Sequence, residues 1–174
     1  MNITIISCSL NPDSRSRVLA NSAAEILRKH EATVQLLDLR EHPLPMCDGE
    51  SCDPVAIAPL RDAILKSDAI LLAVPIYNYD VNAAAKNLVE QTGKAWEGKS
   101  VGFLCAAGGH GSYMSVMSLA NSLMLDFRSL IVPRFVYAVG KDFDGDEIAS
   151  PKIRERIEQL CSETARLAKA LRSN

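Results

Sequence analysis

Hydroxyl and guanidinium side chains are concentrated in one short segment near the amino terminus, residues 7–17, with the sequence SCSLNPDSRSR. The segment follows an apolar run of strand length and precedes a stretch with helical periodicity. A helix N-terminus offers unpaired N–H groups and a positive dipole end, which favour an anion. Ser9, Ser14 and Ser16 add hydroxyl donors and Arg15 adds charge, a set that suits a terminal phosphomonoester. A capped helix start on a polar loop explains the same residues without a ligand.

The spacing within this segment excludes two common nucleotide sites. It is not GxGxxG, which a dinucleotide site on a strand–helix turn requires, and it is not the GxxxxGK[ST] of nucleoside triphosphatases. We therefore favour a monophosphate. Arg17 lies further along the expected helix and turns away from the loop.

A second unusual loop is VPIYNYD, residues 74–80. Pro75 is expected to end a strand, which places Tyr77 and Tyr79 in the loop that follows. The two rings suit a flat aromatic ligand. For Tyr79, packing against neighbouring helices is an equally good interpretation.

A third loop, AAGGHGSY at residues 106–113, contains Gly108, Gly109 and Gly111. These glycines permit close approach of the backbone to a ligand and expose N–H groups. His110 suggests an acid–base role, but a histidine among glycines is more often a rim residue or a phosphate contact.

A phosphate loop, tyrosines and a glycine-rich wall together indicate FMN. Hydride arriving at flavin N5 leaves negative charge at N1 and the C2 carbonyl, which backbone N–H groups and a helix expected to start near Ser112 can stabilise. We therefore expect no catalytic side chain, because the flavin carries the chemistry. We also expect no metal site: Cys47 and Cys52 lack a second ligand pair, and DFDGDE at residues 142–147 is interpreted as a solvated turn.

Strand and helix patterns alternate along the chain and must position these loops. Strands are expected at 2–7, 32–39, 68–75, 100–109 and 129–140, and helices at 15–29, 54–67, 81–93, 112–127 and 150–173. This alternation predicts an α/β fold, a three-layer sandwich with a five-stranded parallel sheet in the flavodoxin-like order 2-1-3-4-5, as one domain over residues 1–174. The switch point between strands 1 and 3 brings the three loops to one edge. A response-regulator receiver shares this topology but needs carboxylates where this chain has Ser7, Cys8, Ser9 and Pro75.

Composition narrows the class of protein. The chain has 174 residues, a net charge of −2 and 48% hydrophobic residues, which favours neither nucleic acid nor an anionic membrane surface. No apolar run has the length of a membrane span, and no basic leader precedes the first strand. Five scattered cysteines are expected to be reduced thiols, so we expect a cytoplasmic protein.

The order of the three loops resembles the NADPH-dependent FMN reductase family of the flavodoxin-like superfamily, nearest to the FMN reductases that supply sulfonate monooxygenases. SLNPDSRS (9–16), PIYNYDVNAAAKN (75–87) and AAGGHG (106–111) are similar to the family's phosphate loop, Pro-x-Tyr-Asn loop and Gly-Gly flavin loop. The resemblance implies the following FMN contacts: Ser9, Ser14, Arg15, Ser16, Pro75, Ile76, Tyr77, Asn78, Gly108, Gly109 and His110. Cys8 and Asn11 depart from the family's usual Gly and Arg, and the missing Arg weakens a preference for NADPH over NADH.

The resemblance also implies an activity and an assembly. The expected enzyme is an FMN-dependent NAD(P)H oxidoreductase that passes electrons from NADPH or NADH to an acceptor such as free flavin or a quinone. Alternatives are a flavodoxin-like electron carrier without its own NAD(P)H-oxidising activity, and a cofactor-free interaction module. Family members are homodimers or homotetramers, and Met114 and Leu125 project away from the apolar face expected on helix 112–127. That face comprises Tyr113, Val116, Met117, Ala120, Leu123, Met124 and Phe127.

Overall fold

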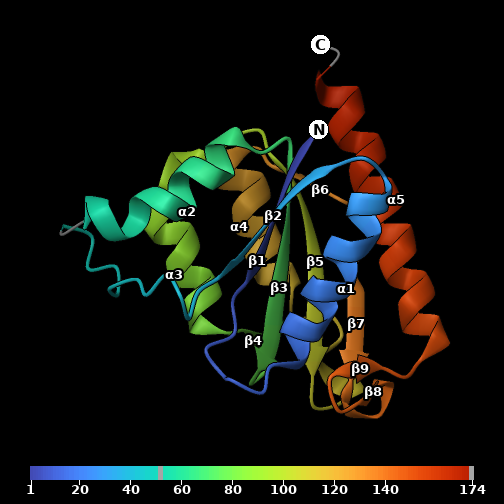
Figure 1. The fold of residues 1–174 in the computed structure, drawn as a ribbon. Helices are drawn as coiled ribbons and strands as arrows, with labels where there is room; N and C mark the ends of the chain where they lie inside the picture. Colours follow the sequence, from blue (N-terminus) through green and yellow to red (C-terminus); the bar gives the residue numbers. More distant parts are fainter. Residues whose placement is uncertain (51–52, 173–174) are drawn as a thin grey trace.

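A parallel β-sheet lies between two layers of helices in the computed structural model, which describes residues 1–50 and 53–172 (Figure 1). The long strands are β1 (Asn2–Ser7), β2 (Thr33–Asp38), β3 (Ala69–Tyr77) and β5 (Ser100–Ala107). The helices are α1 (Arg15–Lys29), α2 (Pro54–Lys66), α3 (Ala83–Thr92), α4 (Met117–Phe127) and α5 (Pro151–Arg172). None of the described helices is long and apolar enough to cross a membrane.

The order of the strands is β2-β1-β3-β5, and two short strands continue the sheet beyond β5. β6 (Leu130–Ile131) and β7 (Val136–Val139) both pair with β5 in parallel. They occupy the place of the single strand expected at 129–140, interrupted around Pro133, because a proline has no N–H to donate to the ladder. The flavodoxin-like order 2-1-3-4-5 is confirmed.

Each face of the sheet has its own hydrophobic core. α1 and α5 pack on one face, with Leu19, Leu27 and Leu160 buried against the strands. α2, α3 and α4 cover the other face, on the far side of the sheet from α1 in Figure 1. Because both faces are covered, the central strands are apolar on both sides, as their sequences predicted.

The helix expected at 112–127 begins later than predicted. Residues 110–112 form a single 3₁₀ turn, and α4 starts only at Met117. Val116, Leu119, Ala120 and Leu123 are the residues that pack on the sheet. The expected apolar face was wrong for Tyr113, Met117 and Met124, which are exposed, and it missed Leu119. The expectation that a helix starts near Ser112 and stabilises charge on the flavin was therefore wrong.

Candidate functional site

A cavity of about 780 Å³ opens at the carboxyl ends of β1, β3 and β5, where the sheet order reverses. Its size lies within the range usual for sites that hold cofactors. The three loops singled out by sequence meet around it. The lining residues are Ser9, Asn11, Asp13, Ser14, Arg15, Ser16, Pro75, Ile76, Tyr77, Asn78, Ala106, Ala107 and Gly108.

The first loop presents buried hydroxyl groups to this cavity. Ser9, Ser14 and Ser16 are each less than a tenth exposed. Ser14 is the N-cap of α1 and accepts a hydrogen bond from the N–H of Arg17, while its Oγ lies 3.0 Å from that of Ser16. The Oγ of Ser9 accepts from the N–H of Asn11 at 3.2 Å, so its own hydrogen remains available to donate. With no acidic residue in the first turn of α1, the loop provides several donors for an anion.

Two arginines of α1 behave differently. Arg15 lines the cavity, and its guanidinium lies beside Gly140 at the end of β7. Arg17 instead donates to the carbonyl of Pro12 at 2.6 Å and lies 3.8 Å from the carboxylate of Asp38. Arg17 is absent from the cavity lining, as its place on the helix predicted.

The second loop is a β-hairpin, and the expectation that Pro75 ends β3 was wrong. β3 runs on to Tyr77 and pairs antiparallel with β4 (Asp80–Val81). Pro75 still pairs with Ala106 of β5. On the other side of β3, the pairing with β1 ends at Ser7, opposite Ala73, so no residue of β1 lies opposite Pro75 to accept the hydrogen bond that a proline cannot donate. The carbonyl of Pro75 still accepts a hydrogen bond from the N–H of Asn82.

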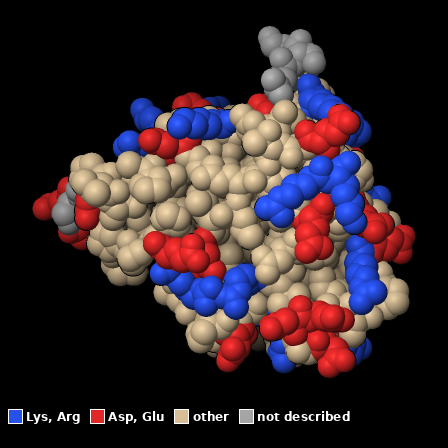
Figure 2. Space-filling model, in the orientation of Figure 1, with Lys and Arg blue, Asp and Glu red and all other residues tan. Residues whose placement is uncertain are grey.

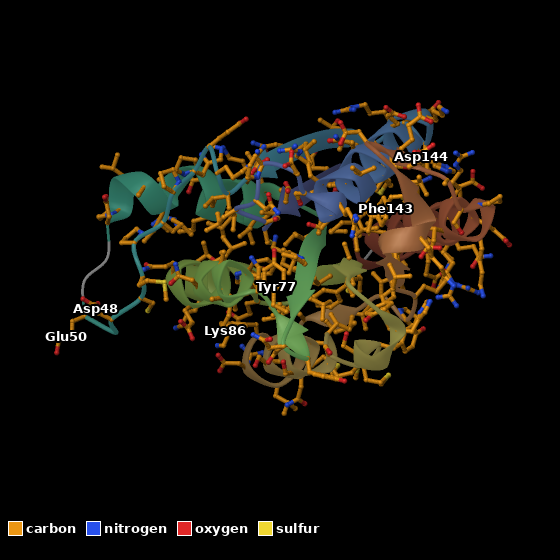
Figure 3. All side chains as sticks on the ribbon, turned by 90° about the horizontal axis from the view of Figure 1, so that it is seen from below. Asp48, Glu50, Tyr77, Lys86, Phe143 and Asp144 are labelled. Carbon is orange, nitrogen blue, oxygen red and sulfur yellow. The ribbon has the colours of Figure 1, made fainter. Side chains whose placement is uncertain are left out.

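Asn78 and Tyr79 form the turn of this hairpin with positive φ values of 51° and 65°. Positive φ at both central residues is typical of a type I′ turn, which suits asparagine but strains a bulky residue such as tyrosine. Tyr77, the last residue before this turn, lines the cavity, and Figure 3 shows it from the side where the strands end. Tyr79 is exposed and its hydroxyl lies close to Gly111.

The third loop follows β5 and is hydrogen-bonded to the side chain of Tyr137 on β7. The Tyr137 hydroxyl lies 2.7 Å from both the Gly109 carbonyl and Ser112 Oγ. Gly108 lines the cavity, whereas Gly109 and His110 are outside its lining. A Cβ built on Gly108 or Gly109 meets nothing within 4 Å, and neither residue has a positive φ. The fold therefore does not require glycine here, and the empty space beside the backbone fits a bound group.

Four lining residues were missed by the analysis of the sequence. Asn11 and Asp13 belong to the first loop, where the Asn11 side chain accepts from the N–H of Asp13. Ala106 and Ala107 end β5, and their small side chains give no signal beyond their position beside the glycines. The Tyr137 contact joins residues 28 apart and was also missed.

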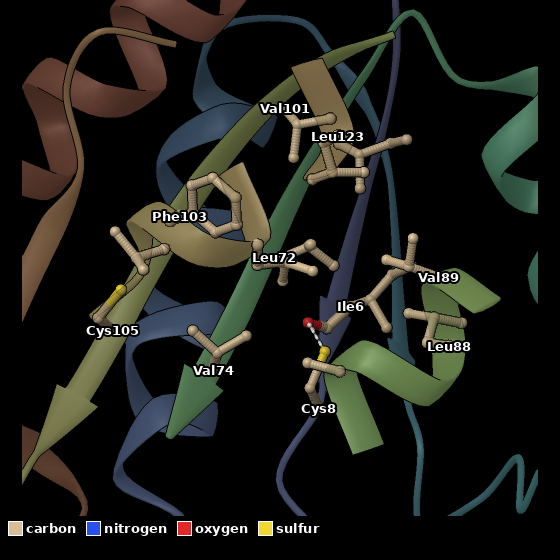
Figure 4. Close-up of a cluster of buried hydrophobic side chains, with 14 of the residues drawn as sticks. Ile6, Cys8, Leu72, Val74, Leu88, Val89, Val101, Phe103, Cys105 and Leu123 are labelled. Atoms are coloured by element: carbon tan, nitrogen blue, oxygen red, sulfur yellow. Dashed lines mark hydrogen bonds between the residues drawn. The ribbon is translucent and has the colours of Figure 1, made fainter. Parts of the chain in front are cut away.

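Cys8, directly after β1, is a core residue and not part of the cavity. It is fully buried and its thiol lies 3.6 Å from the carbonyl oxygen of Ile6, among Leu72, Val74 and Leu88 (Figure 4). Burial, and secondarily the charge of Asp38, raise the pKa of the Cys8 thiol far above its usual range, so it remains protonated. Cys47 is a free, partly exposed thiol, and Cys52 lies outside the described residues.

Asp38 connects the end of β2 to the first loop. Its carboxylate accepts hydrogen bonds from the guanidinium of Arg40 at 2.7 and 3.1 Å and lies near the guanidinium of Arg17. Burial alone would raise the pKa of Asp38, but the hydrogen bonds from Arg40 and the charges of both arginines outweigh it and lower that pKa below its usual value.

We expect Asp38→Asn to destabilise the fold at neutral pH by about 1–2 kcal/mol, because two guanidinium groups lose their anion. A lowered folded-state pKa contributes stability above the unfolded pKa, and that contribution disappears as pH falls through the folded pKa. Urea unfolding at pH 7 and pH 3 should therefore show a difference between the proteins that shrinks in acid. An equal difference at both pH values would contradict the prediction.

The chain is similar to a known protein family in both sequence and structure. A family model described as NADPH-dependent FMN reductase matches residues 1–144. An NAD(P)H-dependent FAD/FMN reductase of Geobacillus thermodenitrificans is 27% identical, with 82% of this chain and 80% of that protein covered. An FMN-dependent NADH:quinone oxidoreductase of Bordetella petrii is 27% identical over 79% of this chain and 83% of that protein. Among solved structures, the flavoenzyme FerB of Paracoccus denitrificans superimposes with a TM-score of 0.77 at 19% identity, covering 97% of each chain, which supports the fold.

Proposed function

Because the chain belongs to the NADPH-dependent FMN reductase family and is an NAD(P)H-dependent flavin oxidoreductase, we propose that it binds FMN in the cavity at the carboxyl edge of the sheet. The observation that carries this proposal is the convergence of three separate loops on one cavity. Its lining combines the hydroxyl and guanidinium donors of the first loop with the uncrowded glycine backbone of the third.

Three groups of residues hold the cofactor in this proposal. Ser9, Ser14, Arg15 and Ser16 bind its phosphate. Pro75, Ile76, Tyr77 and Asn78 lie along the isoalloxazine and ribityl chain. The backbone of Gly108 and Gly109 faces the polar edge of the ring, and His110 lies at the rim. The buried hydroxyls of Ser14 and Ser16 support the first group, because only one of them donates in the hydrogen bond between them and the other hydroxyl hydrogen is left for a ligand.

FMN, when bound, supplies hydride transfer from NADPH or NADH to an acceptor. The chain itself supplies no acid–base side chain for this step in our proposal. Its residues orient the flavin and leave one face of the ring open beside Tyr77 and the third loop. We propose that the acceptor is a free flavin or a quinone, since relatives are named for both activities.

The electron-carrier alternative receives no support from the surface charge. Such carriers are usually strongly acidic, whereas this chain has a net charge of −2. Figure 2 shows Lys and Arg side chains interspersed with Asp and Glu on the face in view. An enzyme that oxidises NAD(P)H itself is therefore the better interpretation.

Purified protein tests the proposal directly. We expect it to bind one FMN per chain, visible as a shifted flavin absorbance and quenched fluorescence, and to oxidise NADPH or NADH in the presence of FMN and a quinone. Absence of both FMN binding and pyridine nucleotide oxidation would refute it.

We also propose a homodimer or homotetramer formed through the α4 side of the molecule. Met114 and Leu125 are 60% and 76% exposed, and Met117 on α4 is also exposed. A groove of about 770 Å³ between α3 and α4 brings Lys86, Lys94 and Arg128 together with Glu90, Glu97 and Asp126. Balanced charge of this kind suits a second copy of the same surface.

Leu125→Glu is expected to weaken this assembly by about tenfold or more, because a charge would be buried in the contact. Light scattering at micromolar concentration measures the effect. Leu171→Glu on α5, in the opposite helix layer, is the matched control because Leu171 is also an exposed leucine. A monomeric wild-type protein would contradict the assembly itself.

The cytoplasm is the location that we propose. NAD(P)H donors are available there, and the described cysteines Cys8, Cys47, Cys105 and Cys161 are free thiols, as expected for a reducing compartment.

A further inference from the structure

A short hairpin formed by residues 143–148 packs beside the N-terminus of α1. β8 (Phe143–Asp144) pairs antiparallel with β9 (Glu147–Ile148), so the DFDGDE run that the sequence suggested to be a solvated turn contains a small sheet.

The hairpin is fixed at its base by Asp142. The Asp142 carboxylate accepts a hydrogen bond from the N–H of Val139, the last residue of β7, at 2.8 Å. Its carbonyl accepts from the N–H groups of Ala149 and Ser150, just before α5. Because both ends of the segment are bonded to large elements, Phe143 has a defined place relative to the sheet.

The guanidinium of Arg15 lies near both Phe143 and Gly140. The Cζ of Arg15 lies over the Phe143 ring, 6.0 Å from its centroid. A Cβ added to Gly140 would lie 3.2 Å from Nη1 of Arg15, closer than an ordinary contact. Figure 3 views the molecule from the edge of the sheet where the ends of β3 and β8 lie, with Tyr77 and Phe143 labelled.

The charge of Arg15 has no carboxylate partner among the described residues. A ring against the face of a guanidinium attracts the cation but leaves its N–H edges free. Those edges are the groups that pair with phosphate oxygens. Arg15 is therefore held at the cavity edge by contacts that do not consume its donors.

We propose that Phe143 and Gly140 are positioning residues, which hold Arg15 so that its guanidinium reaches the phosphate of the bound flavin. The inference rests on the proposed function, because it takes the FMN phosphate as the anion that Arg15 binds. The ring of Phe143 restricts the rotamers of Arg15, and the absent Cβ of Gly140 leaves room for the guanidinium.

Riboflavin, which lacks the phosphate, isolates this effect from any general change in the cavity. Apo-protein is titrated with FMN and with riboflavin, and the dissociation constants come from quenching of flavin fluorescence. Phe143→Leu is expected to raise the constant for FMN by about two- to fivefold, the usual contribution of an exposed cation–π contact, and to leave riboflavin unchanged. Phe143→Tyr keeps a ring and should restore the wild-type ratio of the two constants.

Asp144→Asn provides a matched control in the same hairpin. Its side chain is exposed and forms no ion pair with Arg15 among the described residues, and the removal of an anion cannot weaken phosphate binding through long-range charge. Gly140→Ala tests the positioning by a second route, because crowding Nη1 should lower the preference for FMN over riboflavin without any change of ring.

The Arg15→Ala background separates the possible outcomes. If the proposal holds, Phe143→Leu causes no further loss of FMN affinity when Arg15 is absent. Equal weakening of FMN and riboflavin, or an undiminished effect in the Arg15→Ala background, would show that the hairpin acts only through the fold and would overturn the inference. If Arg15→Ala changes the ratio while Phe143→Leu and Gly140→Ala do not, the phosphate site stands and the positioning role fails. If Arg15→Ala leaves the ratio unchanged, both fail.

Discussion

Arg15→Ala is expected to raise the dissociation constant for FMN by about 10- to 150-fold, which corresponds to the loss of about 1.5–3 kcal/mol from charge-assisted hydrogen bonds. The side chain lines the cavity and has no carboxylate partner among the described residues, so the truncation removes donors directed at the ligand. The effect should fall on FMN and spare riboflavin. It should also diminish at high salt, because the guanidinium is exposed.

Arg28→Ala is the matched control for this prediction. Arg28 lies in the last turn of the same helix, so its removal changes the net charge equally at the opposite end. Fluorescence titration at fixed ionic strength measures both variants. An FMN affinity that is the same in Arg15→Ala and wild type would remove the phosphate assignment from the first loop.

Gly108→Val is expected to weaken FMN binding by about 10- to 100-fold while changing the stability of the apo-protein little. A Cβ at this position meets no protein atom within 4 Å, and the residue lines the cavity, so the added side chain occupies the space assigned to the flavin. Overpacking of a filled site usually opposes binding by 1–3 kcal/mol, roughly the range stated. Gly108→Ala should give a smaller loss of the same kind.

Thermal unfolding of the apo-protein is the control for Gly108→Val. A midpoint that matches wild type, combined with weak binding of both FMN and riboflavin, would support the proposal, because the ring and not the phosphate meets the new side chain. Strong FMN binding by a folded Gly108→Val would contradict the place of the ring beside the third loop.

The larger features of the fold were predictable from local patterns. Apolar runs and amphipathic stretches alternate, and the predicted α1 has the same bounds as the observed helix, because Ser14 is a clear N-cap before an amphipathic repeat. The order of the strands followed from the rules for parallel sheets. The three loops followed from that order, which is why most of the cavity lining was predicted.

The differences arise where tertiary contacts override local signals. Pro75 was expected to end β3, but a neighbouring strand that stops at Ser7 makes a proline acceptable there. The 3₁₀ turn that precedes α4 is hydrogen-bonded to the Tyr137 hydroxyl of β7, and this contact between segments separated in sequence has no local signal. The contact of Phe143 with Arg15 also joins distant segments, and no short-range pattern indicates it.

A crystal structure of the complex with FMN tests the central claim most directly. We predict that the flavin phosphate lies within about 3 Å of the hydroxyls of Ser9 and of Ser14 or Ser16, the usual distance for such hydrogen bonds, with the ring between Tyr77 and Gly108. A phosphate bound elsewhere, such as in the groove between α3 and α4, would contradict the proposed site.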